Sequence, residues 1–296
     1  MTATRLAWAA TLLVFLIGSM TVAGPGADRA HAQALNNDDL WARATAPLDA
    51  SPWGPAPQVF GGYSNGCITN AVALPLDGPG FTVIRPQRNR YWGHPRLIAF
   101  VQQMGQFAAT LGPDLLMVAD LAQPRGGPIS GHVSHEVGLD ADIWLRFAPP
   151  GGLADAERTA PQELSVLTAD ETAIDPTRWT AAHEALYRFA ATHPDTTRIF
   201  AHPLIKQHLC RTVTGDRSWL GRVVPWYGHN AHMHIRLRCP ADSPFCVNQA
   251  PVGAGDGCGG ALAWWLSDAP YQSTGGPVTP PPLPALPPQC AALAPD

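Results

Sequence analysis

Two short segments in which polar and apolar residues alternate constrain the fold more than any other feature of the sequence. They are Leu139–Leu145 (LDADIWL) and His232–Cys239 (HMHIRLRC). Successive side chains of a β-strand point to opposite faces, so strict alternation predicts a strand with one apolar and one polar face. Clean alternation of this kind is typical of antiparallel sheets. The polar faces would carry Asp140, Asp142, His232 and His234.

The sequence around these segments predicts helices that can cover such a sheet. Arg96–Gly112 places apolar residues at helical spacing, and Gly112 suits the end of a helix. Thr177–His193 predicts a second helix with Thr177 as its N-cap, and Asp114–Ala122 predicts a buried strand. No GxGxxG or P-loop pattern is present. We therefore expect an α+β fold, in which helices flank a central antiparallel sheet and disulfides cross-link the domain.

The N-terminus has the features of an export signal. Arg5 precedes a long apolar run, and Ala30–Ala32 (AHA) offers the small residues that signal peptidase needs. The alternative is an uncleaved membrane anchor, because the run is nearly long enough to span a bilayer. We expect residues 1–32 to be a cleaved signal peptide, which leaves a mature chain that does not contact the membrane.

The residues after the signal predict one domain and a tail. Residues 33–275 contain no obvious linker or internal repeat, and one domain is the default at this length. Residues 276–296 are too rich in proline for a helix or strand and should run extended. The net charge of −4 and the pI of about 6.2 give no basis for a nucleic-acid partner, which needs a clustered basic face.

Six cysteines in an exported chain predict three disulfides. They are Cys67, Cys210, Cys239, Cys246, Cys258 and Cys290. No CxxC pattern occurs, so a zinc site built from thiolates is not expected. The count alone leaves open all 15 connectivities that six cysteines allow. Cys290 lies within the proline-rich segment, so one disulfide should tie the tail back to the domain.

Clustered histidines indicate a metal site. The sequence has 11 histidines, of which five fall in two short stretches: His132, His135, His229, His232 and His234. Imidazole and carboxylate suit Zn²⁺, which binds them at about 2.0–2.2 Å in tetrahedral geometry. A catalytic zinc site uses three protein ligands and leaves the fourth position to water. The two alternating strands would then carry metal ligands on the central sheet.

The spacing of these residues resembles a known family. His135 and Asp142 match an HxxxxxxD motif, and His232 and His234 match an HxH motif. The two motifs resemble the zinc peptidases grouped as lysostaphin, D-Ala-D-Ala metallopeptidases and hedgehog-like domains. Within that group the chain resembles the penicillin-insensitive murein endopeptidases. The matching segments are GCI, RYWGHP, SHEVGLDADI, RIFAHPLIKQHLC, PWYGHNAHMHIRLRCPAD, and GDGCG followed by a proline-rich tail that contains a cysteine.

The resemblance implies roles for individual residues. The zinc ligands implied are His135, Asp142 and His234, and His132 is implied as a further histidine at the metal site. The catalytic residues implied are His232 and His229. The disulfides implied are Cys67–Cys290, Cys210–Cys258 and Cys239–Cys246. Some members carry an Asp and a His, three apart, at a second metal position. Here Asp170 is present but Ala173 replaces the histidine, so one zinc is expected and a second is doubtful.

The resemblance also implies a function. It is that of a periplasmic zinc D,D-endopeptidase, insensitive to penicillin, which hydrolyses the D-alanyl–meso-diaminopimelyl cross-links of peptidoglycan with metal-activated water. Two alternatives stay open at the level of the sequence. One is a non-catalytic, cell-wall-binding domain that zinc stabilises, and the other is a D,D-carboxypeptidase that trims stem peptides.

Several polar residues near these motifs have two interpretations. Arg85, Arg88 and Arg90 either bind a substrate carboxylate or form a solvated basic loop. Asp140 either orients a ligand histidine or faces solvent. Glu136 is not expected to be a catalytic base, because no histidine follows at the spacing of an HExxH helix.

Overall fold

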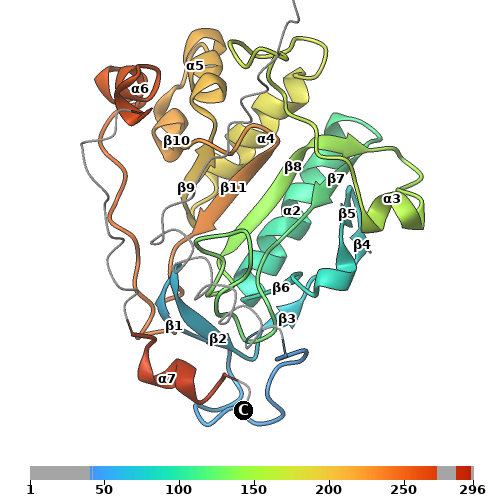
Figure 1. Cartoon of the computed structure of the whole chain (residues 1–296), viewed down its shortest axis with the longest axis vertical. Coiled ribbons are helices and arrows are strands. Elements are labelled where there is room, and N and C mark those ends of the chain that lie inside the picture. The colour runs from blue at the N-terminus through green and yellow to red at the C-terminus, as the bar shows by residue number, and fades with distance from the viewer. Residues whose placement is uncertain (1–40, 42, 272–284, 295–296) are drawn as a thin grey trace, which may run out of the picture.

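A seven-stranded mixed sheet forms the centre of the molecule in the computed structural model (Figure 1). The structure describes residues 41, 43–271 and 285–294. The expected signal peptide and residues 276–284 and 295–296 of the expected tail lie outside that part. The strand order is β10-β9-β11-β8-β7-β5-β4. The bounds are β4 Asp77–Gly78, β5 Phe81–Val83, β7 Leu115–Val118, β8 Asp140–Ala148, β9 Thr196–Ala201, β10 Val223–Pro225 and β11 His232–Leu237.

The α+β class is confirmed, but the sheet is not antiparallel throughout. The pairings β9–β11, β11–β8 and β8–β7 at its centre are antiparallel, whereas β10–β9 and β5–β7 are parallel. Parallel neighbours need a crossover connection, and helices provide both. Helix α2 (Pro95–Leu111) lies between β5 and β7 in sequence, and α5 (Pro203–Thr212) lies between β9 and β10.

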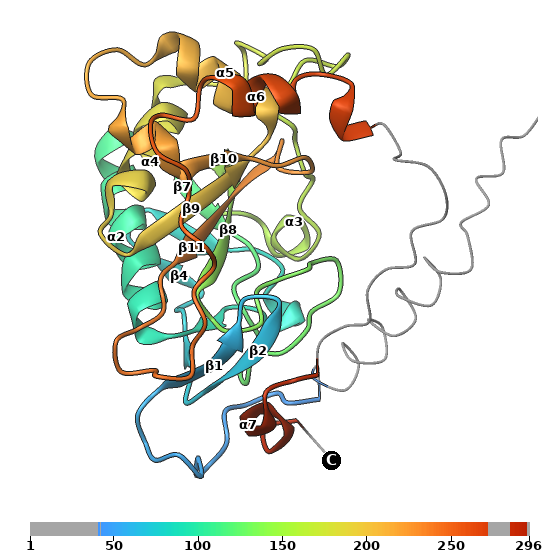
Figure 2. The ribbon, with the colours of Figure 1, turned by 90° about the vertical axis from the view of Figure 1, so that its left-hand side faces the viewer.

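Helices α2 and α4 (Ala181–Thr192) cover one face of the sheet, as Figures 1 and 2 show. The predicted helix over residues 96–112 is confirmed, with buried Leu97, Val101 and Met104 along one stripe. The opposite face of the sheet carries the polar side chains of β8 and β11, and the loop before β8 buries Asp140 and Asp142 there.

The predicted N-cap of the second helix is wrong. Helix α4 begins at Ala181 with Thr180 as its N-cap, and His183 completes a capping box with Thr180. Asp175 binds both the backbone N–H (2.8 Å) and the hydroxyl (2.6 Å) of Thr177. Thr177 is therefore used in a turn before the helix, a role that competes with capping in short polar side chains.

Smaller elements complete the described chain. The two-stranded sheets pair β1 (Gln58–Gly62) with β2 (Asn65–Thr69) and β3 (Val72–Ala73) with β6 (Trp92–Gly93). The remaining helices are η1 Pro86–Arg88, α3 Asp155–Thr159, η2 Ser218–Arg222, α6 Gly260–Trp265, η3 Ala269–Tyr271 and α7 Pro288–Ala291. Within the described residues, no helix is both long and apolar enough to cross a membrane.

All three disulfides have the connectivity that the resemblance implied: Cys67–Cys290, Cys210–Cys258 and Cys239–Cys246. The first ties the C-terminal segment to β2, where both cysteines are fully buried. That segment is not wholly extended as expected, because it contains the short helix α7. A proline at the first helical position costs no hydrogen bond, since the N–H it lacks would have no partner there.

A buried lysine connects α5 to η2 and to the loop before α6. Lys206 is the one lysine of the sequence and is fully buried. Its ammonium donates hydrogen bonds to the carbonyl oxygens of Leu220 and Asp256. Burial lowers the pKa of Lys206 to about 8, against an opposing effect of the nearby Asp256 carboxylate.

Candidate active site

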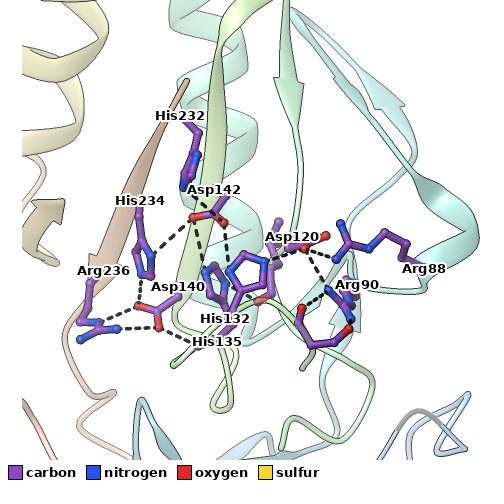
Figure 3. Close-up of polar contacts among 12 residues, drawn as sticks. Arg88, Arg90, Asp120, His132, His135, Asp140, Asp142, His232, His234 and Arg236 are labelled. Carbon is purple, nitrogen blue, oxygen red and sulfur yellow. Dashed lines mark hydrogen bonds and ion pairs between the residues drawn. The ribbon is translucent and has the colours of Figure 1, made fainter. Parts of the chain in front are cut away.

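The two alternating segments lie side by side at the centre of the sheet as β8 and β11. Their register places His234 opposite Asp142 and Arg236 opposite Asp140. The intervening residues Ile143, Met233 and Ile235 belong to the main hydrophobic core. The two strands therefore have one apolar face, which belongs to the core, and one shared polar face, whose side chains Figure 3 shows.

A loop that precedes β8 lays two more histidines over this polar face. His132 and His135 belong to this loop, and Gly131 and Gly138 within it both have positive φ angles. His135 itself has a φ of 73°, a left-handed conformation that is uncommon for a residue with a side chain. Its backbone N–H donates to Asp140 Oδ2 at 3.1 Å, which helps to hold that conformation.

Three imidazoles converge on the carboxylate of Asp142. His135 Nε2 lies 3.4 Å and His234 Nδ1 3.5 Å from Asp142 Oδ1. His132 Nδ1 lies 3.5 Å from Asp142 Oδ2. Ligand atoms of His132, His135 and Asp142 all lie within 4.8 Å of one another. The four residues come from the loop, from β8 and from β11, so only the folded chain brings them together (Figure 3).

The outer nitrogen of each imidazole faces an oxygen. The partners are the Leu121 carbonyl for His135 Nδ1 (2.7 Å), Asp120 Oδ2 for His132 Nε2 (2.8 Å) and Asp140 Oδ1 for His234 Nε2 (3.2 Å). The hydrogen bonds of His132 and His135 favour the tautomer in which the outer nitrogen carries the proton, whereas His234 Nε2 lies near Asp140 without a hydrogen bond to it. In that tautomer the inner nitrogens of His132 and His135 direct a lone pair toward Asp142, which is the arrangement that metal-binding histidines need.

Two inner atoms of the cluster lack a hydrogen-bond partner among the described residues. They are His135 Nε2 and Asp142 Oδ1, and both are buried. An unsatisfied buried polar group costs about 1–3 kcal/mol, so the cluster is poorly satisfied by the protein alone. A cation between the inner atoms would satisfy both, so these residues fit a metal such as zinc.

The electrostatics of the cluster favour positive charge. Burial on its own would lower the pKa of His135, but Asp142, Asp140 and Asp120 outweigh it and raise the pKa to about 9. Burial would raise the pKa of Asp120, but His132 and the neighbouring arginines lower it to about 2. The carboxylates therefore remain ionised and attract either a proton or a cation.

His232 and His229 lie beside this cluster. His232 Nε2 is 3.9 Å from Asp142 Oδ2, and the ring of His229 is 4.9 Å from that of His232. Both line a cavity of about 350 Å³. Burial, followed by repulsion from His232 and His234, lowers the pKa of His229 to about 3. His229 Nδ1 lies 3.1 Å from the Tyr227 carbonyl, which favours a proton on Nδ1 and an accepting Nε2.

Asp120 is a site residue that sequence reasoning missed. It is buried, and its Oδ2 accepts from His132, from Arg88 (3.0 Å) and from Arg90 (3.2 Å). Arg90 is also held by the carbonyl and hydroxyl of Ser130. The sequence shows only that Asp120 is a carboxylate at the end of an apolar strand. The residues that hold it lie in other segments, so no local motif includes it.

The three arginines of the basic segment all contact other residues of the protein, so the segment is not a free solvated loop. Arg88 and Arg90 are engaged with Asp120, and Arg85 lies over the ring of Trp144 at 4.9 Å. Arg88 and Arg90 therefore support the carboxylate that faces His132, whereas Arg85 contacts an aromatic ring.

The structure also resolves the alternatives for two acidic residues. Asp140 is fully buried and accepts two hydrogen bonds from Arg236 (2.7 and 3.0 Å), so it does not face solvent. Its contact with His234 places it behind a candidate ligand. Glu136 accepts a hydrogen bond from the backbone of Gly66 at 2.9 Å, which connects the loop to β2.

Fold and site together define the class of this protein. It is a disulfide-bonded α+β domain with a candidate metal centre of histidines and a carboxylate beside a surface cavity. Residues 59–294 match the family model described as penicillin-insensitive murein endopeptidase. The chain belongs to this family, as the resemblance of its motifs indicated.

Three relatives show how far the similarity extends, and each is named a penicillin-insensitive murein endopeptidase. The protein from Haemophilus influenzae is 44% identical over 250 residues, which cover 83% of this chain and 86% of that protein. The protein from Yersinia enterocolitica is 41% identical, with 86% and 89% covered. The protein from Klebsiella pneumoniae is also 41% identical, with 86% and 90% covered.

Proposed function

We propose that this chain is a periplasmic zinc D,D-endopeptidase that hydrolyses D-alanyl–meso-diaminopimelyl cross-links in peptidoglycan and is insensitive to penicillin. The observation that carries the proposal is the convergence of three imidazoles on the buried carboxylate of Asp142. Family membership supports a murein substrate, because the relatives are named for it.

One zinc ion would be held by His135, Asp142 and His234, and His132 would be a further histidine at the metal site. Bound zinc would supply Lewis acidity, which polarises a carbonyl and makes water a nucleophile near neutral pH. The oxygens behind the imidazoles would orient the rings, so that the inner nitrogens are free to bind the metal once it has displaced any proton from them.

His232 and His229 are the residues that we propose for proton transfer. His232 lies one residue before the candidate ligand His234 on the same face of β11, with Nε2 directed toward Asp142. Its position at the cavity suits it to take a proton from the attacking water. His229 has an accepting Nε2 when Nδ1 donates to Tyr227, so it can share a proton with its neighbour His232 or orient the substrate.

A digest of cross-linked muropeptide dimers tests the proposal. The purified mature chain should convert dimers to monomers, a chelator should abolish the conversion, and added zinc should restore it. Penicillin should have no effect, because no serine acyl-enzyme is involved. Product masses decide between activities: release of free D-alanine alone would indicate a carboxypeptidase, and binding to sacculi without turnover would indicate a wall-binding domain.

The same proposal includes the processing of the chain. Residues 1–32 would be removed on export, residues 33–275 would form the endopeptidase domain, and residues 276–296 would form the tail. Three disulfides support export, because such bonds persist in oxidising compartments. The mass of the protein recovered from a periplasmic extract measures the cleavage site, and a full-length mass would contradict it.

A further inference from the structure

A continuous series of aromatic rings leads from the candidate metal centre to the surface of α6. Phe200 lies 5.1 Å from the ring of His234 and 5.9 Å from that of Trp226, which lines the cavity. Trp226 lies 5.6 Å from Trp265, and Trp265 lies 5.1 Å from Trp264. Trp226, Trp264 and Trp265 are called the aromatic platform below.

The aromatic platform is exposed although its side chains are large and apolar. Trp226 is 48% exposed and Trp264 is 50% exposed. Single exposed apolar residues are common, but adjoining ones that continue a cavity mark a binding surface. The platform therefore extends the active-site cavity outward along α6, at the edge of the molecule beside α5 (Figures 1 and 2).

The backbone under the platform is fixed. The disulfide Cys210–Cys258 anchors the chain just before α6 to α5. The hydroxyl of Tyr227 donates a hydrogen bond to the Trp265 carbonyl, and the two rings lie 5.5 Å apart. A surface that is ordered before binding loses less conformational entropy when a ligand arrives.

Peptidoglycan contains charged stem peptides and an uncharged glycan backbone, and the lack of charge around α6 indicates which of the two the platform binds. Residues 257–267 contain no charged side chain. Stem peptides carry carboxylates and amino groups, which an uncharged aromatic surface cannot pair. The glycan strand presents N-acetylated amino sugars, whose rings have C–H faces that stack on indoles and hydroxyls that accept from an indole N–H. The platform suits the glycan.

We propose that the aromatic platform binds the N-acetylated amino-sugar rings of the glycan strand while a stem peptide attached to that strand occupies the cavity. This inference rests on the proposed function and adds a second part of the same substrate to it. It assigns Trp264, which lies outside the cavity, to recognition of substrate.

Two substrates that differ only in their sugars test the platform. One is a cross-linked muropeptide dimer with its disaccharides, and the other is the same dimer after amidase has removed them. Wild type should prefer the first, and Trp264→Ala should lower the ratio of the two kcat/KM values about tenfold. Phe245→Ala is the matched control, since Phe245 is also exposed but packs against Phe60 on β1. Its ratio should equal that of wild type.

The other occupants of the platform give different results, and each would overturn the inference. An unchanged ratio in Trp264→Ala with a lowered Tm would mean that the chain itself covers the platform. An unchanged ratio with dissociation in sedimentation would mean that a second copy does. An equal fall in kcat/KM on both substrates would mean that Trp264 has a structural role and does not bind sugar.

Direct binding separates failure of the platform from failure of the proposed function. Titration of the full chain with N-acetylglucosamine tetramer should quench tryptophan fluorescence in wild type, and Trp264→Ala should weaken that binding. If wild type cleaves neither substrate, the endopeptidase proposal fails, and this titration alone decides on the platform. No saturable binding by wild type would overturn the platform even if cleavage is observed.

Discussion

At the scale of single residues, the site is organised around one buried negative charge. Asp142 is held ionised by the histidines around it, and the same carboxylate raises the pKa of His135. A carboxylate in this position must be balanced, either by a proton on His135 or by a cation. Acidic conditions should therefore favour the protonated histidine over a bound metal, because metal ligands must be deprotonated.

Replacing His232 separates catalysis from metal binding. His232→Ala should retain about one zinc per chain, because it lies behind Asp142 rather than among the inner nitrogens, and should lose about 100-fold or more in kcat. Metal content by mass spectrometry and muropeptide turnover measure the two effects. His208→Ala, on α5 beside Trp179, is the control that should keep both. Loss of metal from His232→Ala would make His232 a ligand instead.

Asp120 should affect metal affinity without touching the metal. Asp120→Asn keeps the shape of the side chain but removes the negative charge that faces His132 Nε2. Removal of such a partner typically weakens metal binding about 10- to 100-fold, and we expect that range here. Competition with a chromogenic chelator measures it. The control is Asp77→Asn, because Asp77 pairs with Arg158 and supports none of the histidines. Equal affinities in both variants would contradict the role of Asp120.

The residues of the site could be predicted from the sequence only where they share a motif. His135 and Asp142 lie seven positions apart and His232 and His234 two apart, so a linear pattern contains each pair. Asp120 is held by Arg88, Arg90 and His132, none of which is at a regular spacing from it. Such a network exists only once the chain is folded, so no local pattern reports it.

At the scale of elements, close contact between α2 and the turn before β5 depends on a glycine. Gly80 has a φ of +72°, and a Cβ there would lie 1.9 Å from the Gly105 carbonyl on α2. Gly80→Ala should therefore lower the free energy of unfolding by about 2–4 kcal/mol. Gly112→Ala is the control, since nothing lies within 4 Å and the backbone there is extended. Urea unfolding measures both, and equal stabilities would contradict the contact.

Helices and strands could be predicted from the sequence where neighbouring residues form a periodic pattern of apolar side chains. The stripe of α2 and the alternation of β8 and β11 are periodic, and both appear as expected. The start of α4 was misplaced, because Thr177 and Thr180 are equally good caps in isolation and Asp175 decides between them. Parallel pairing of β5 with β7 depends on where a crossover helix returns, which no periodicity encodes.

At the scale of the whole molecule, the disulfides should differ in what they contribute to stability. Cys67–Cys290 closes a loop with a sequence separation of 223, and Cys239–Cys246 one with a separation of 7. Chain entropy predicts losses of about 5 and about 2–3 kcal/mol when each is removed. Guanidinium unfolding of the two paired Cys→Ser variants measures the difference. A larger loss from the short loop would contradict the entropic account.

The single lysine of the sequence makes this protein an unusual target for amine-directed labelling. Amine-directed reagents normally find many surface targets, but here the side-chain amine of Lys206 is enclosed between α5 and two backbone carbonyls. The native chain should accept a single label, at its α-amino group, which permits oriented attachment to a surface or a dye. A second adduct can form only when α5 separates from its neighbours. The rate at which intact mass gains that adduct would report how often this part of the molecule opens.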